Sequence, residues 1–435
     1  MSGRAQGRHA RARRFGLRGI GPEIIAGASD NDPTNVGTAA VVGAQTGYRL
    51  SWVALLVAPL LGVVLAIAAQ VGLAARSDLQ TLTRQRYGRG LAAVLLVSVV
   101  VVNVVTIAAD LQAGSAGIGL LTGVSSRWLV LPLGAGLGAL LLIGRYGQVV
   151  ALVRWVLPGF LVFTAAAVLA RPDWPRLLRA SLVPGLSLGG HDLAGSLALL
   201  GTTLTSYVYV WETVQRGVEE PGETEPGGTE SGGTESGGTG RGDGRLARAR
   251  TGAIAGAVFT ALILWSMLVA SAATLGRHHQ AAASAQDAAR SLRPLAGPLA
   301  GDLFAAGLVV STVVALPVLI ASTAHVVGAQ FDWRRGLSQP VGQARGFYAA
   351  LAISIGLAVA VSLAGIPVLR MLVVASVIGG LGTPLGLVIL VRLARDPQVM
   401  NGQTISRPLA AAGWTVAVAV TALGVLLLAM AAARA

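Results

Sequence analysis

The sequence predicts an all-α polytopic membrane protein of eleven transmembrane helices, with the first and sixth helices broken at mid-length. Three observations support this fold class. Hydrophobic residues make up 54% of the 435 residues, and charged residues only 12%, roughly half the ~25% usual in soluble domains. The apolar residues fall into runs of about twenty or more, the length that spans a bilayer. Two of these runs carry polar interruptions at corresponding places, which indicates a five-plus-five inverted repeat with a binding site at the membrane midplane.

The composition also excludes several classes of protein. The mean hydropathy of +0.68 is too high for an ordinary soluble enzyme. All 33 basic residues are arginines, and against 19 acidic residues they give a formal net charge of +14. The arginines are dispersed through short gaps between apolar runs, which is typical of cytoplasmic loops rather than of a nucleic-acid surface. The chain has no cysteine, so a disulfide framework, a thiolate nucleophile and a cysteine-type metal site are all excluded.

The predicted helices follow from the apolar runs in chain order. The eleven runs cover residues 20–48, 50–75, 91–121, 128–144, 149–170, 193–216, 249–276, 299–328, 347–364, 368–393 and 408–432. If the N-terminus is inside, the tail and the inner loops hold 23 of the 33 arginines, and the other side holds ten. Since arginine near the end of a span resists translocation, we expect a multi-pass protein of the inner (plasma) membrane with a cytoplasmic N-terminus and an external C-terminus.

Between these runs the sequence divides into four parts. Residues 1–19 contain six arginines without an apolar stretch, which predicts a basic cytoplasmic tail rather than a cleaved signal peptide. Helices 1–6 occupy residues 20–217, and helices 7–11 occupy residues 248–435. The segment 218–247 between them is rich in Gly, Glu and Thr and carries seven of the nineteen acidic residues, which predicts a disordered cytoplasmic linker. A metal-sensing role for its acidic residues is the alternative.

The first run has its interruption around Asp32 and Pro33. Proline lacks an amide hydrogen and disfavours helix at the residue before it, so the helix should break here. A carboxylate at this depth requires a partner, water or a cation, and free carbonyls, carboxylates and an amide make an oxygen-rich site suited to a hard divalent cation. The alternative is a kinked helix in which Asp32 only caps the second half. For Asp30, exposure at the mouth of a cavity and ligation are both open.

The sixth run has its interruption between Gly201 and Glu212, where small and hydroxyl residues replace the apolar pattern. The interruption includes Thr202, Thr205 and Tyr207. The alternative is an unbroken helix whose threonines bond back to the preceding turn. Glu212 could contact and orient the metal ligands without binding the metal itself, or it could form a salt bridge with Arg216 one turn later.

Several motifs resemble the natural resistance-associated macrophage protein (Nramp) family and keep its order along essentially the whole membrane part. They are Asp32-Pro33-Thr34-Asn35, similar to the family's Asp-Pro-Gly-Asn, followed by Gly43 to Tyr48, Ala108 to Leu111, Arg171 to Trp174 with Val183-Pro184, Thr383 to Leu385, and Asp396 to Gly402. The resemblance implies a leucine-transporter-like fold of eleven or twelve helices. It also implies transport of a divalent metal by alternating access, with the metal as substrate and no cofactor.

The resemblance further assigns residues. Asp32 and Asn35 match the family's metal ligands in the first helix, and the carbonyl-bearing turn of the sixth helix should fall near Thr202. Asp110 matches an aspartate of the third helix on the family's proton or salt-bridge route. A buried pair between Asp110 and an arginine is an equal alternative.

The departures from the family bear on the cargo. Proton-coupled members have Met-Pro-His where this chain has Thr205-Ser206-Tyr207; Ala113 replaces a glutamate, and Ser376 stands at a glutamine position. The chain thus lacks the soft ligand that favours Mn, Fe or Cd and the groups best suited to carry protons. This pattern resembles the Nramp-related magnesium transporter branch, although Asn35 is retained as in ordinary Nramps. We expect Mg²⁺ or Mn²⁺ transport with weak or absent proton coupling; a proton-coupled Mn²⁺/Fe²⁺ importer is the alternative.

Other functions fit the sequence less well. An amino-acid carrier of the same fold binds a carboxylate at its helix break, which the two aspartates Asp30 and Asp32 would repel. We expect no enzyme, because no aspartate-rich diphosphate motif and no nucleophile with a base appears. His325 is expected to be a packed histidine and Trp211 an anchor at the lipid interface, and His278-His279 could collect metal weakly.

Overall fold

The structure, a computed structural model, describes residues 29–143, 157–185, 190–219, 238–274 and 299–432, and every regular element within them is helical. The helices of at least nine residues are α2 (Pro33–Thr46), α3 (Ser51–Ala75), α4 (Leu79–Thr122), α5 (Ser126–Ile143), α7 (Leu161–Leu169), α8 (Trp174–Leu182), α9 (Gly190–Thr203), α10 (Ser206–Val214), α11 (Gly238–Thr274), α13 (Leu299–Gln330), α14 (Arg345–Ser362), α15 (Val368–Ala394) and α16 (Arg407–Ala432). Short helical turns η2 (Gly47–Leu50), η3 (Leu157–Phe160) and η4 (Gln215–Glu219) connect some of them.

Nine helices in the described ranges are long and apolar enough to cross a membrane, counting α9, α10 and η4 as one broken span. The two remaining predicted spans contain the shorter helices α2 and α7, and parts of both spans, within residues 1–28 and 144–156, lie outside the described ranges. The predicted all-helical fold class is confirmed for the described residues, in which Asp30 to Asp32 are not helical before α2 and Leu204 and Thr205 are not helical between α9 and α10. The predicted tail, residues 1–19, and His278-His279 lie outside the described residues.

Two helices extend beyond the predicted apolar runs. Helix α4 begins at Leu79, twelve residues before the predicted 91, because its first turns are amphipathic and escaped a search for apolar residues. A kink at Gly88, with a φ of 84°, separates this part from the apolar span. Helix α11 begins at Gly238, inside the predicted linker 218–247, and residues 220–237 of that linker lie outside the described ranges.

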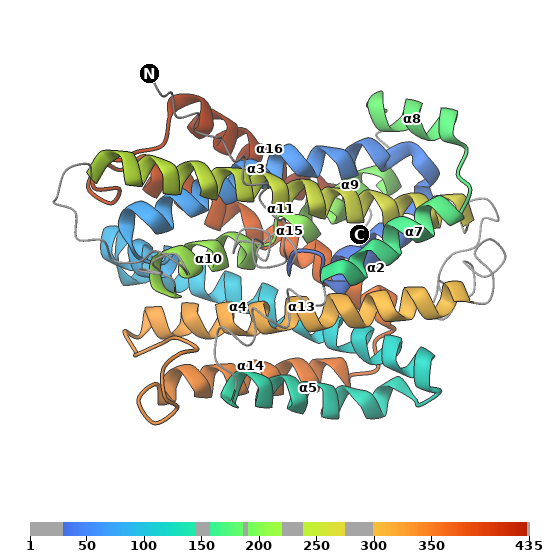
Figure 1. Cartoon of the computed structure of the whole chain (residues 1–435), viewed down its shortest axis with the longest axis horizontal. Helices are drawn as coiled ribbons and strands as arrows, with labels where there is room; N and C mark the ends of the chain where they lie inside the picture. The colour runs from blue at the N-terminus through green and yellow to red at the C-terminus, as the bar shows by residue number, and fades with distance from the viewer. Residues whose placement is uncertain (1–28, 144–156, 186–189, 220–237, 275–298, 433–435) are drawn as a thin grey trace, which may run out of the picture.

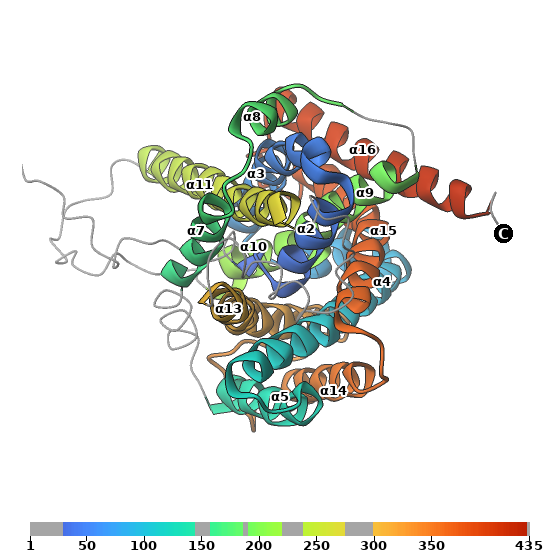
Figure 2. The ribbon, with the colours of Figure 1, turned by 90° about the vertical axis from the view of Figure 1, so that its right-hand side faces the viewer.

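The long helices run along the long axis of the molecule (Figure 1). Seen along this axis, α2 and α10 lie in the middle of the bundle, with α3, α11, α13, α4 and α15 around them and with α5 and α14 on one side (Figure 2). Helix α4 packs along α13, α11 along α3, and α15 against α4, α9 and α2. The broken helices are therefore enclosed by unbroken ones, as non-helical backbone at membrane depth requires.

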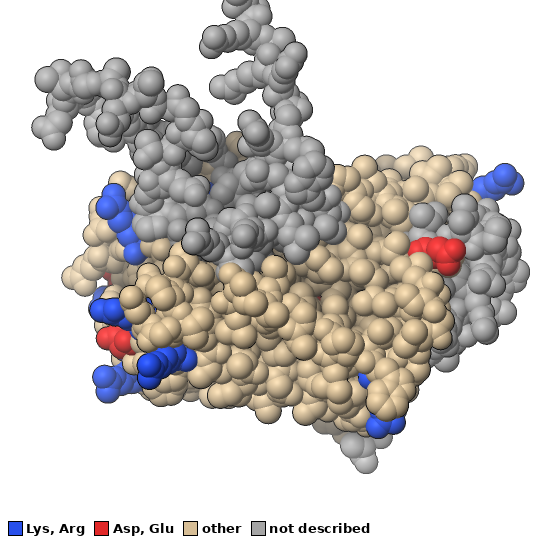
Figure 3. Space-filling view, turned by 60° about the horizontal axis from the view of Figure 1, so that its bottom comes forward, with Lys and Arg blue, Asp and Glu red and all other residues tan. Residues whose placement is uncertain are grey.

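The flank of the molecule is apolar. In the face shown in Figure 3, charged side chains gather toward the two ends, and a broad band without charge lies between them. Exposed large apolar side chains recur along the outer helices, for example Val97 on α4, Ile353 on α14 and Val418 on α16. A broad apolar surface of this kind indicates contact with lipid.

Trp211 lies in the interior of the protein, whereas the sequence predicted it at the lipid interface. Trp211 is buried, not exposed to lipid, and its ring centroid lies 6.1 Å from that of His325. On the other side, the His325 ring lies 5.0 Å from Phe347 in an edge-to-face arrangement. His325 is thus a packed histidine as expected, whereas the assignment of Trp211 to the lipid interface was wrong because α10 is surrounded by other helices.

Candidate metal centre

The break in the first span is centred on Asp32. This residue has extended backbone (φ −68°, ψ 165°), and its Oδ1 accepts a hydrogen bond of 2.6 Å from the amide of Asn35. Pro33 occupies the first helical position of α2, where no amide hydrogen is needed. The capping alternative is therefore correct as local geometry. It does not remove Asp32 as a ligand, because each carboxylate oxygen has a second lone pair.

The side chain of Asn35 is held in one orientation. Its Nδ2 donates to the carbonyl oxygen of Asp30 at 2.8 Å. Its Oδ1 is buried and has no hydrogen-bond partner among the described residues. An amide anchored through nitrogen presents its oxygen, which is the atom that coordinates a hard cation.

The hydroxyl of Tyr207, on α10, lies between the two broken helices. It is 2.9 Å from the carbonyl oxygen of Ser29 and 3.2 Å from Oδ2 of Asp32. A phenol has one proton for these two acceptors. Tyr207 can therefore keep its bond to Ser29 when a cation takes Oδ2 of Asp32.

Two further aspartates lie close to this segment. Asp30 is fully buried, which excludes the expected alternative of exposure at a cavity mouth, and neither carboxylate oxygen has a partner within the described chain. Oδ1 of Asp110, from α4, accepts from the amide of Thr34 at 3.0 Å and from its hydroxyl at 2.6 Å. The alternative of an Asp110–arginine pair is thus wrong, since the residue binds the start of α2 instead.

The break in the sixth span consists of Leu204 and Thr205, between α9 and α10. The carbonyl of Leu204 accepts from the hydroxyl of Thr383 at 2.9 Å. The hydroxyl of Thr205 is 3.5 Å from the carbonyl of Thr202, a long and therefore weak hydrogen bond. Oγ1 of Thr202 is buried and without a partner in the described residues. Both threonines thus have oxygens that a ligand could engage with little loss of internal bonding.

Ser376 on α15 connects the two breaks. Its hydroxyl lies 2.6 Å from the hydroxyl of Thr38 on α2. Its carbonyl faces α9 so closely that a Cβ at Gly201 would lie 2.6 Å from it. Thr34, Thr38 and Thr383 were not among the predicted site residues. The four-residue spacing of Thr34 and Thr38 could have identified the first two, because it places both on the same face of α2.

Glu212, at the far end of α10, forms an ion pair of 3.2 Å with Arg216 one turn later. This is the salt-bridge alternative stated for it above. Glu212 and Arg216 are both largely buried.

Together these residues make a site of oxygen atoms. The described part of the chain contains no group of three His, Cys, Asp or Glu side chains placed to hold a metal. A cation here would depend on the carboxylate of Asp32, supplemented by amide, hydroxyl and carbonyl oxygens. Such a ligand set favours hard divalent cations.

Two broken helices that meet at a buried carboxylate, inside a helical membrane protein, define the inverted-repeat class of secondary transporters. The comparison with known proteins gives the family within this class. The model of the family described as natural resistance-associated macrophage protein-like (Nramp) matches residues 23–430. The chain belongs to this family, as its motifs indicated.

Curated relatives carry the name divalent metal cation transporter MntH. The protein from Deinococcus radiodurans is 28% identical over 414 residues, which cover 93% of this chain and 88% of the relative. The protein from Mycobacterium tuberculosis is 28% identical over 425 residues, covering 94% and 90%. These relatives are transporters by name, not enzymes.

Solved structures share the fold. The manganese transporter of Eremococcus coleocola superposes with a TM-score of 0.74 at 16% identity, covering 94% of this chain and 85% of that one. A nucleobase-cation-symport-1 family transporter superposes with a TM-score of 0.59 at 13% identity, covering 94% and 93%. The expected leucine-transporter-like architecture is confirmed by these similarities.

Proposed function

We propose that the protein moves a divalent metal cation, Mg²⁺ or Mn²⁺, across the cell's inner membrane by alternating access, with weak or absent coupling to protons. The observation that carries this proposal is the pair formed by Asp32 and Asn35. One supplies the carboxylate at the helix break, and the other presents an amide oxygen that has no partner in the described chain. The names of the curated relatives support a divalent metal as the cargo.

The burial of the site supports an occluded state of the transport cycle. Asp32, Asn35, Thr202 and Thr205 are each no more than 2% exposed. A cation can therefore reach them only when the helices around the site move apart. The non-helical residues in the first and sixth spans provide joints at which half-helices can tilt without breaking the longer helices around them.

The chemistry of the sixth helix supports acceptance of Mg²⁺. Thr205 offers a hydroxyl in place of a thioether, so a soft cation gains no favoured ligand. A hydroxyl also leaves room for water that Mg²⁺ retains. Tyr207 stands where proton-coupled members have histidine, and a phenol lacks the second ring nitrogen through which an imidazole can pass a proton on.

A proton-coupled Mn²⁺/Fe²⁺ importer remains the second candidate, because Asn35 is retained and the structural relative at a TM-score of 0.74 is named a manganese transporter. An amino-acid carrier of the same fold has weaker support. One solved structure of this fold contains L-phenylalanine, at 12% identity and a TM-score of 0.56. In this chain Asp30 and Asp32, both buried, would repel the carboxylate of such a substrate.

The test is uptake of Mn²⁺ or Mg²⁺ into proteoliposomes by the parent protein and by Asp32→Asn. Asparagine is an equally good helix cap, so the substitution removes the charge while it preserves the start of α2. We expect uptake to fall to the background of empty liposomes with an unchanged thermal unfolding transition. Asp173→Asn, the same change at the exposed N-cap of α8, serves as the matched control and should transport normally. Uptake by Asp32→Asn at the parent rate would contradict the site.

A further inference from the structure

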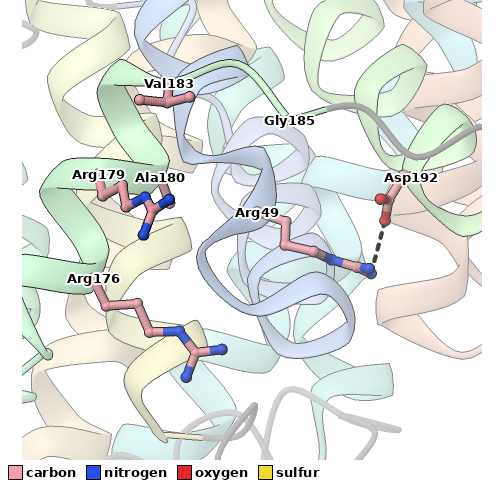
Figure 4. A pocket seen from close by; sticks show the side chains of 7 residues that line it. All are labelled: Arg49, Arg176, Arg179, Ala180, Val183, Gly185 and Asp192. Atoms are coloured by element: carbon pink, nitrogen blue, oxygen red, sulfur yellow. Dashed lines mark hydrogen bonds and ion pairs between the residues drawn. The ribbon is translucent and has the colours of Figure 1, made fainter.

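Helix α8, between α7 and α9, has three distinct faces. Leu177 and Ser181 are buried against the protein, and the hydroxyl of Ser181 accepts a hydrogen bond of 3.1 Å from the indole of Trp265. Arg176 and Arg179 project on a second face, toward η2 (Figure 4). The third face is apolar and carries Trp174, Leu178 and Leu182, each four residues apart.

This apolar face is uncovered. Trp174 is 45% exposed, Leu178 is 52% exposed and Leu182 is 75% exposed, and Val183 directly after the helix continues the stripe. No element in the described part of the chain packs over them. A short helix with one apolar and one basic face, and with a tryptophan at its start, is typical of helices that lie in the plane of a membrane interface.

A pocket of about 510 Å³ adjoins this helix (Figure 4). Arg49, Arg176, Arg179 and Asp192 supply its charged lining, with Val183 at its edge. Arg49 is engaged by Asp192 at 2.9 Å. Three arginines against one aspartate leave two unbalanced positive charges, and neither Arg176 nor Arg179 has an ion-pair partner within the described residues. The pocket is therefore suited to an anion rather than to the proposed cationic substrate.

The pocket lies where membrane spans end. Arg49 belongs to η2, which joins the end of α2 to the start of α3, and Asp192 is in the first turn of α9. Side chains at the ends of apolar helices meet the headgroup region of the bilayer. We propose that this pocket binds the phosphate of an anionic phospholipid, whose acyl chains lie along the apolar stripe of α8.

A lipid explains both features at once. Arginine guanidinium groups make charge-assisted, often bidentate hydrogen bonds to phosphate oxygens. Val183 lines the pocket and also extends the exposed stripe, so a headgroup in the pocket continues into chains on the apolar face. A free phosphate ion would use the arginines but not Trp174, Leu178 or Leu182.

The experiment measures binding of fluorescent phosphatidylglycerol to the purified full-length protein in detergent, with phosphatidylcholine and inorganic phosphate as competitors. Arg176→Gln with Arg179→Gln should weaken phosphatidylglycerol binding roughly thirtyfold, the expected effect of two basic residues at an anionic surface. Leu178→Asn with Leu182→Asn removes the stripe and should also weaken it severalfold. Arg127→Gln, an exposed arginine outside the pocket, is the matched control and should bind like the parent.

Unchanged lipid affinity in the double arginine variant, in protein that still elutes as one species and unfolds at the parent temperature, would overturn the proposal. So would equal competition by inorganic phosphate combined with no effect of the leucine substitutions, because the site would then hold a free anion. Equal binding of phosphatidylcholine and phosphatidylglycerol would likewise contradict a site built on the positive charge of Arg176 and Arg179.

Discussion

At the scale of single residues, Tyr207 gives the buried carboxylate of Asp32 a second hydrogen-bond donor. Its hydroxyl lies near both Ser29 and Asp32, and the amide of Asn35 is the first donor to Asp32. Donors of this kind lower the free-energy cost of burying a carboxylate. When a cation takes Asp32, the phenol keeps the carbonyl of Ser29, and the exchange leaves neither group unsatisfied.

Thr205 is the residue at which the cargo can be changed. We expect Thr205→Met to shift preference toward Cd²⁺ and Mn²⁺, because a thioether adds a soft ligand and removes a hydroxyl that water can share. The measurement is flux of Mg²⁺, Mn²⁺ and Cd²⁺ at equal concentration, together with calorimetry on parent and variant.

Thr205→Ser, which keeps the hydroxyl, is the control and should retain the parent order of ions. Tight Cd²⁺ binding by the parent itself, with no gain in Thr205→Met, would show that softness at this position does not set selectivity. The chain would then behave as an ordinary manganese-type member of its family.

At the scale of elements, the contact between α9 and α15 holds the second break in place. Gly201 on α9 meets Gly380 and the carbonyl of Ser376 on α15, so that a Cβ at Gly201 would lie 2.6 to 2.8 Å from their backbone atoms. Small residues that let helix backbones approach are a common basis of packing in membranes. The hydroxyl of Thr383 then reaches the freed carbonyl of Leu204.

Gly201→Ala should therefore separate α9 from α15. We expect a loss of stability of about 1–3 kcal/mol, typical of overpacking, and a marked fall in uptake because the ligand-bearing turn moves. Gly136→Ala on α5 is the matched control, since a Cβ there meets nothing within 4 Å. Equal stability and transport in the two variants would contradict a close contact at Gly201.

Local chemistry made the breaks predictable. Pro33 has no amide hydrogen, and the run of hydroxyl residues around Thr205 interrupts an apolar span, so both positions follow from the sequence. The residues that contact these breaks from other helices could not be predicted from the sequence. Asp110 bonds to Thr34 across 76 positions and Ser376 to Thr38 across 338, and pattern within one helix carries no information about which face of another it meets. For the same reason the sequence left an arginine partner for Asp110 open.

At the scale of the whole molecule, ion pairs tie the start of α4 to two loops at the same end. Arg335 binds Asp78 at 2.7 Å, and Arg84 binds Asp332 at 2.8 Å. Asp396, after α15, pairs with Arg86, and this hydrogen bond holds the pKa of the Asp396 carboxyl below its usual range. Residues 76–90, 334–345 and 392–407, which meet at this end, contain ten of the 23 arginines on which the predicted cytoplasmic side rests.

The orientation can be measured because the chain has no cysteine. Single cysteines at two exposed positions, Ser125 between α4 and α5 and Gln398 after α15, mark the two ends. We expect a membrane-impermeant maleimide to label Ser125→Cys on intact cells, and Gln398→Cys only after permeabilisation. The reverse pattern would place the N-terminus outside and refute the arginine-based assignment.

The most direct test of the central proposal is competition during Mn²⁺ uptake into proteoliposomes at two pH values. With an oxygen-only centre around Asp32 and no histidine at position 207, we predict that millimolar Mg²⁺ inhibits Mn²⁺ uptake and that an inward proton gradient does not drive accumulation. Uptake that ignores Mg²⁺ and accumulates Mn²⁺ in response to the proton gradient would contradict this account.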